Sequence, residues 1–142
     1  MPDLLDANVW LALSVPDHAH HSRALAYWND QASDTLLFCR VTALALLRHL
    51  TNPRVVGDSA LDSADAWAAW QAWLAVPEVR LAREPDGLDR FLEAHGIGRS
   101  IRSGGWTDAY LAAFAQASKS RLVTFDQGFH QIPDLERLVL VP

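Results

Sequence analysis

Three aspartates stand at positions where a parallel α/β sheet usually collects its functional groups. Asp6 directly follows the apolar pair LL, Asp126 follows the run RLVTF, and Asp108 opens the helix-like run TDAYLAAFAQAS. In a parallel sheet the carboxyl ends of the strands meet at one edge, and ligands bind at that edge. We therefore expect the three carboxylates to converge.

Converging carboxylates predict a cation. Without one they repel each other and raise each other's pKa. A hard divalent ion, Mg²⁺ or Mn²⁺, relieves that repulsion and prefers oxygen ligands. Such an ion promotes ionisation of water near neutral pH and stabilises a phosphoryl transition state. The spacing thus favours a metal-dependent phosphodiesterase in which Asp6, Asp108 and Asp126 bind the metal and carry catalysis.

Each aspartate also has a purely structural explanation. Asp108 could complement the dipole of its helix, and Asp126 in DQG could form a turn. Asp6 could cap a helix by accepting from the amide of Asn8 or Val9. Their joint placement in the apolar contexts LLDAN, WTDAYLAAFA and LVTFDQGF favours a shared site.

The elements expected to position these groups are short apolar strands that alternate with helices. Strands are predicted at residues 4–5, 36–39, 79–81, 121–124 and 138–141. Helices are predicted from residue 9 to 13 and at 17–31, 42–50, 63–75, 86–96 and 107–118, with Asp17 and Thr107 as N-caps. This alternation predicts an α/β fold, a parallel sheet flanked by helices on both faces.

Composition narrows the class of protein. The chain has 142 residues, half of them hydrophobic, which predicts one compact domain over 1–142. No apolar run approaches the length of a membrane span, and the start MPD lacks a secretory signal. The single cysteine, Cys39, excludes an internal disulfide and suits a cytoplasmic location. A net charge of −5 argues against a broad basic surface for nucleic acid.

Three segments carry a family resemblance: LLDANVWLAL, RHLTNPRV and WTDAYLAAFAQASKSRLVTFDQGF. In order and spacing they resemble the PIN-domain ribonucleases, specifically VapC-type toxins of bacterial toxin–antitoxin pairs. The resemblance implies a Rossmann-like, PIN-like sheet, Mg²⁺ or Mn²⁺ as cofactor, and endonucleolytic cleavage of RNA, with structured RNA such as tRNA a possible target. It also implies a homodimer inhibited by a small VapB-type antitoxin.

Carried over by position, the three aspartates coincide with the family's metal-site acids. Asn8 and Thr124 coincide with polar positions that support the site. Relatives commonly carry a glutamate three residues before the arginine equivalent to Arg48, where this chain has Ala45. Three acids can hold one metal with water completing its coordination. With alanine at this position, the chain has no carboxylate there to bind a second metal ion or to act as a general base.

Three other acids are candidate substitutes for the missing glutamate: Asp3, Glu84 and Asp86. A carboxylate site that binds RNA also needs cationic groups at its margin. Arg99 and Arg102, in the glycine-rich stretch GIGRSIRSGG, are the first candidates for binding substrate phosphate, against the alternative of an ordinary polar loop. The next candidates are Arg40, Arg48 and Arg54.

Other conspicuous side chains favour structural roles. Tryptophans 67, 70 and 73, three residues apart, favour core packing or a dimer surface over base stacking. Histidines 18, 20 and 21 favour a solvated helix start over zinc binding, and Cys39 favours an inert core position.

Two rival functions remain open. The first, motivated by Ala45, is a PIN-like domain that binds RNA or protein with weak or no cleavage. The second is a phosphohydrolase with Asp6 as nucleophile, which would need a second aspartate where Asn8 stands and a lysine base.

Overall fold

A computed structural model describes residues 1–97 and 105–142. Its centre is a five-stranded sheet in the order β3-β2-β1-β4-β5. The strands are β1 (Asp3–Leu5), β2 (Leu36–Phe38), β3 (Val79–Leu81), β4 (Arg121–Thr124) and β5 (Arg137–Val139). The helices are α1 (Ala7–Ser14), α2 (His21–Asp30), α3 (Arg40–Leu50), α4 (Pro53–Val56), α5 (Ser63–Leu74), α6 (Leu88–Gly96) and α7 (Gly105–Ala117), with the 3₁₀ turns η1 (Gly57–Ser59) and η2 (Gln127–Gln131).

Every strand pair in the sheet is parallel, which confirms the predicted α/β fold. In the middle strand, Leu4 stands opposite Leu37 of β2 and Leu122 of β4. The chain moves outward from β1 to β2 and β3 on one side, and to β4 and β5 on the other. The crossover point between β1 and β4 is where ligands bind in folds of this kind.

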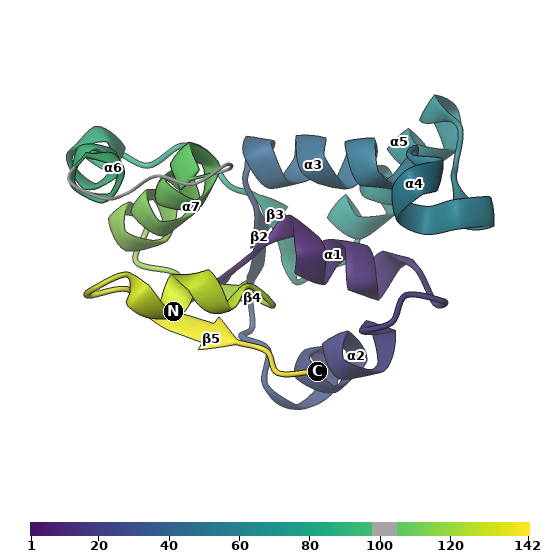
Figure 1. Cartoon of the computed structure of the whole chain (residues 1–142), viewed down its shortest axis with the longest axis horizontal. Coiled ribbons are helices and arrows are strands. Elements are labelled where there is room, and N and C mark those ends of the chain that lie inside the picture. The colour runs from purple at the N-terminus through teal and green to yellow at the C-terminus, as the bar shows by residue number, and fades with distance from the viewer. Residues whose placement is uncertain (98–104) are drawn as a thin grey trace.

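Two apolar layers cover the sheet (Figure 1). Helices α1, α2, α3 and α5 pack on one face, where the ring of Trp10 stacks on Phe38 at 3.9 Å between centroids. Helices α6 and α7 pack on the other face, where Phe114 and Leu111 are almost fully buried. Because both faces are covered, the central strands are largely apolar: β2 is LLF, and Leu4, Leu5, Leu122 and Val123 of β1 and β4 are fully buried.

The predicted strands are confirmed to within two residues at each end, but two predicted helix caps are wrong. Helix α2 begins at His21, four residues after Asp17, and its N-cap His20 makes no side-chain cap. The His21 ring nitrogen Nδ1 lies 2.7 Å from the carbonyl oxygen of Ala12, so the start of α2 is fixed against α1. Helix α7 begins at Gly105, which places Thr107 inside the first turn.

Three short helical segments were not predicted: α4 and the 3₁₀ turns η1 and η2. Pro53 begins α4, with Asn52 accepting from the amide of Arg54, although the TNP stretch was expected only to end the preceding helix. The DQGF stretch, expected as a turn, leads into η2. In the described ranges no helix is both long and apolar enough to cross a membrane.

Candidate functional site

Asp6 lies at the joint between β1 and α1. Its backbone amide donates to the carbonyl of Val123, which continues the pairing with β4 by one residue at 2.9 Å. Its side chain then caps α1, with Oδ1 accepting from the amide of Ala7 at 2.7 Å. The predicted partners, the amides of Asn8 and Val9, are therefore wrong; the Val9 amide donates to the backbone carbonyl of Asp6.

Thr124 joins the ends of β1 and β4. The buried hydroxyl of Thr124 donates to Oδ2 of Asp6 at 2.7 Å and accepts from the amide of Asp126 at 3.0 Å. Asn8 bridges the same two ends, because its Oδ1 accepts from the amide of Phe125 at 3.3 Å and its Nδ2 donates to Thr124 at 3.4 Å. The structure thus brings Asn8 and Thr124 into contact with the segment that carries the aspartates.

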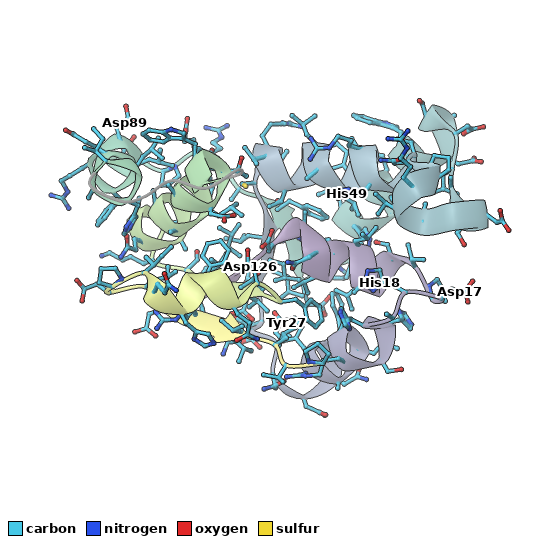
Figure 2. The ribbon with its side chains drawn as sticks, in the orientation of Figure 1. Asp17, His18, Tyr27, His49, Asp89 and Asp126 are labelled. Carbon is cyan, nitrogen blue, oxygen red and sulfur yellow. The ribbon has the colours of Figure 1, made fainter. Side chains whose placement is uncertain are left out.

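Asp126 lies where β4 ends, near the centre of the view in Figure 2, and it is exposed to solvent. Its Oδ1 accepts from the amide of Gly128 at 2.8 Å, which caps η2. The turn-forming explanation for Asp126 is therefore correct as local structure. It does not exclude a second role, because a carboxylate oxygen with one hydrogen bond still has a free lone pair.

Asp108 lies in the first turn of α7 and is half-buried. Burial raises the pKa of Asp108 to about 6, and the charges of Asp126 and Asp6 add to the increase. Burial also raises the pKa of Asp6, with a smaller contribution from the charge of Asp126, while hydrogen bonds from Thr124 and Ala7 oppose it. The charge of Asp126 therefore acts on both Asp6 and Asp108, which places the three predicted acids near one another.

No basic side chain of the described residues neutralises this group of acids. The ion pair in residues 1–97 and 105–142 joins Arg121 to Asp3, at the other end of β1. Within the same residues no three acidic, histidine or cysteine side chains already stand in metal-coordinating proximity. The donor set, three carboxylates without a cation, fits a hard divalent ion, but the structure does not present a preformed coordination shell.

The structure places all three candidate substitutes for the missing glutamate. Asp3 points to the opposite end of the sheet, where Arg121 binds it. The Glu84 side chain is exposed and hydrogen-bonds Tyr110 of α7. Asp86 is exposed in the turn before α6, and Ala45 leaves α3 without an acid. The site therefore consists of three carboxylates. The Glu84–Tyr110 contact had no signal in the sequence.

The structure bears differently on the arginines, the cysteine and the tryptophans singled out in the sequence. Arg99 and Arg102 lie outside the described residues. Cys39 is fully buried, as predicted, and burial raises the pKa of its thiol. Trp70 is buried, whereas Trp67 is 52% exposed, so core packing accounts for only part of the tryptophan series.

The histidine run is partly buried, which the predicted solvated helix start does not describe. The ring of His20 stacks on Phe125, with centroids 4.9 Å apart. Among the described residues these histidines belong to no group of three side chains that could hold a metal ion.

Comparisons with known proteins bear on what this site does. A PIN-domain family profile matches residues 4–135. Ribonuclease VapC41 of Mycobacterium tuberculosis is 42% identical over 143 residues, covering 96% of this chain and 97% of that protein. Ribonuclease VapC29 of the same organism is 35% identical over 144 residues, covering 100% of this chain and 98% of that protein.

Solved structures share the fold. The crystal structure of M. tuberculosis VapC20, a sarcin–ricin loop cleaving toxin, matches with a TM-score of 0.71 at 18% identity, covering 94% of this chain and 97% of that one. VapBC2 from Rickettsia felis, bound to a DNA fragment from its promoter, matches with a TM-score of 0.69 at 14% identity, covering 99% and 100%. At these identities the likeness concerns the fold alone.

Proposed function

This chain belongs to the PIN-domain family and to its VapC ribonuclease branch, and from that membership we propose that it is the toxin of a toxin–antitoxin pair. It hydrolyses phosphodiester bonds within RNA. The observation that supports this function best is the group of Asp6, Asp108 and Asp126, because the charge of Asp126 raises the pKa of both Asp6 and Asp108 where the strands end.

The three aspartates are proposed to hold one divalent cation, Mg²⁺ or Mn²⁺. When bound, the cation supplies positive charge that favours ionisation of a water molecule and offsets charge on the phosphate. Asp6 retains acceptor capacity for this role, since each of its oxygens has one hydrogen-bond donor in the described structure. Ala45 leaves no acid on α3 for a second ion.

The chain's own residues supply positioning. The Thr124 hydroxyl fixes Oδ2 of Asp6, and through the amide of Asp126 it also fixes the backbone that carries the second acid. Asn8 ties the start of α1 to Phe125, so the ends of β1 and β4 move as a unit. This rigidity matters because an in-line attack requires the reacting groups to stay aligned.

The partners follow from the same proposal. The substrate is RNA, with tRNA as one candidate class. A VapB-type antitoxin is the expected protein partner, since VapBC2 of Rickettsia felis is a structure of such a pair. A homodimer and a cytoplasmic location complete the proposal.

A cleavage assay with purified chain tests the function. We expect RNA products in Mg²⁺ or Mn²⁺, none in EDTA, and recovery when the metal is restored. The Asp126→Asn variant should lose cleavage, whereas Asp89→Asn should retain it because that exposed side chain lies on α6, apart from Asp126 in Figure 2. Cleavage that persists in EDTA or in Asp126→Asn would refute the metal-dependent role of these residues.

The alternative is a PIN-like domain that binds RNA or protein with weak or no cleavage. The observations that favour it are Ala45 and the lack of a preformed three-ligand group among the described residues. Binding of RNA without metal-dependent products would support this alternative.

A further inference from the structure

A carboxylate site cannot hold RNA by itself, because its charge has the same sign as the phosphates. The cations that face the same edge of the sheet are therefore the groups to examine. Two exposed arginines follow the neighbouring strands: Arg40 comes two residues after β2 ends, and Arg83 comes two residues after β3 ends.

The sheet geometry places these arginines beside the acids in strand order. The amide of Ala82 donates to the carbonyl of Phe38 at 2.8 Å, so β2 and β3 end side by side just before the two arginines. Neighbouring strands are about 5 Å apart. The backbone at Arg40 is thus about one strand spacing from the edge position of Asp6, and that at Arg83 about two.

Arg40 is held in place by an aromatic ring. Its guanidinium carbon lies 5.4 Å from the centre of the Trp70 ring, and Trp70 is only 3% exposed. Trp67 packs edge-on against Trp70 at 5.0 Å. Stacking on a fixed indole restricts the guanidinium without using its N–H donors, which remain available for phosphate oxygens.

The acid adjacent to Arg83 in the chain has a hydrogen-bond partner on α7. Glu84 follows Arg83 directly, but its carboxylate accepts a hydrogen bond from Tyr110 of α7. In the described part of the chain neither Arg40 nor Arg83 forms an ion pair. Two exposed cations thus follow the strands β2 and β3, which succeed β1 in the order of the sheet.

We propose that Arg40 and Arg83 form a phosphate-binding subsite for the RNA backbone next to the scissile bond. The proposal rests on the proposed ribonuclease function. The RNA strand then crosses the carboxyl edge of the sheet from β4 and β1, where cleavage occurs, toward β2 and β3, where the arginines bind its phosphates. These contacts carry no sequence information, since they involve the backbone alone.

Salt-dependent RNA binding tests the subsite. The probe is a fluorescently labelled single-stranded RNA of mixed sequence, titrated in EDTA from about 50 to about 200 mM salt. Arg40→Ala and Arg83→Ala should each weaken binding roughly tenfold, as loss of a charged hydrogen bond does. Each should also lower the slope of log affinity against log salt by about 0.7, the value for one contact to a single strand.

The matched control is Arg80→Ala. Arg80 lies on β3, is exposed, and donates to the carbonyl of Pro77 before the strand begins, so it points away from the site edge. Its removal should leave affinity and slope unchanged. Arg40→Lys should keep the slope but weaken binding, because lysine retains the charge and lacks the planar group that stacks on Trp70. If Arg40→Ala unfolds below the assay temperature, Arg40→Lys and Arg83→Ala test the proposed phosphate subsite in its place.

Cleavage kinetics give a second readout, in which both alanine variants should raise KM with kcat unchanged. Unchanged affinity and slope in Arg83→Ala and Arg40→Ala would overturn the subsite even if the chain cleaves RNA. Arginine-dependent binding without any cleavage would support the subsite and refute the proposed ribonuclease function. No RNA binding by the unaltered chain would overturn the subsite.

Discussion

The two ends of strand β1 each carry a buried or partly buried aspartate, and the two carboxylates have different partners. At the amino end, Asp3 is 1% exposed and fully compensated. Arg121 donates to both of its oxygens at 2.8 Å, the Tyr27 hydroxyl donates at 2.6 Å, and the Ser33 amide at 3.0 Å. This carboxylate has its counter-charge within the fold.

At the carboxyl end, the donors to Asp6 among the described residues are neutral, the amide of Ala7 and the hydroxyl of Thr124. Its charged neighbours are acids, and the charge of Asp126 raises its pKa further. Burying a carboxylate without a counter-charge is unfavourable. Asp3 is thus paired within the fold, whereas the described residues supply no counter-charge for Asp6, which we propose binds a cation.

The largest expected effect is a loss of activity when Asp6, at the carboxyl end of β1, is replaced. Asp6→Asn should lower RNA cleavage at least about 10³-fold, a loss of roughly 4 kcal/mol of transition-state stabilisation. The free energy of unfolding in EDTA should stay the same or increase, since one charge in a repelling group is removed. Cleavage rates together with urea denaturation check both parts. A variant that is inactive because it is unfolded would contradict the comparison.

At the amino end the effect should fall on stability. Asp3→Asn leaves the Arg121 guanidinium without its carboxylate, which should lower the free energy of unfolding by about 3 kcal/mol. Cleavage per folded molecule should be retained at low temperature, because Asp3 is remote from the three acids. Denaturation curves measure the first part, and assays well below the melting temperature measure the second. Activity loss without destabilisation would reverse the assignment of the two ends.

Removing one hydroxyl at each end gives a smaller, matched comparison. Tyr27→Phe deletes a donor to Asp3 and should cost about 1.5 kcal/mol of stability with no change in kcat. Thr124→Val deletes the donor to Asp6 and should lower kcat roughly tenfold, because the carboxylate loses its fixed orientation. Equal effects of the two variants on kcat would contradict the distinction.

The smallest effect concerns pH. Without metal, the pKa of Asp108 in the folded chain is about 6, above its ordinary value near 4. The folded state therefore binds the proton more tightly, and the stabilisation present below pH ~4 is lost as pH rises through ~6. Because the group is half-exposed, solvent screening limits the effect to about 1 kcal/mol. Asp108→Asn should flatten the stability profile measured in EDTA across this range; an unchanged profile would contradict the coupling.

Much of this arrangement could be predicted from the sequence. The apolar runs predicted all five strands, because strands covered on both faces need continuous apolar residues. In the observed sheet β1 and β4 are parallel neighbours, so Asp6 and Asp126 both follow strands at its carboxyl edge. Asn8 contacts Thr124, and Thr124 contacts Asp6, while the supporting role of both residues stays a prediction.

What the sequence could not predict depends on contacts between distant segments. The ion pair of Asp3 with Arg121 joins residues 118 positions apart, and no local pattern marks it. Helix α2 begins at His21 because that ring meets Ala12 of α1, although Asp17 has the better capping side chain. The cation–π contact of Arg40 with Trp70 depends in the same way on the packing of α3 against α5.

The central claim is that Asp6, Asp108 and Asp126 bind a divalent cation that the fold leaves for them. Calorimetric titration of Mn²⁺ into the unaltered chain and into Asp6→Asn and Asp3→Asn tests it most directly. The account predicts about one ion per chain, binding abolished in Asp6→Asn, and binding retained in folded Asp3→Asn. No binding by the unaltered chain, or undiminished binding by Asp6→Asn, would contradict it.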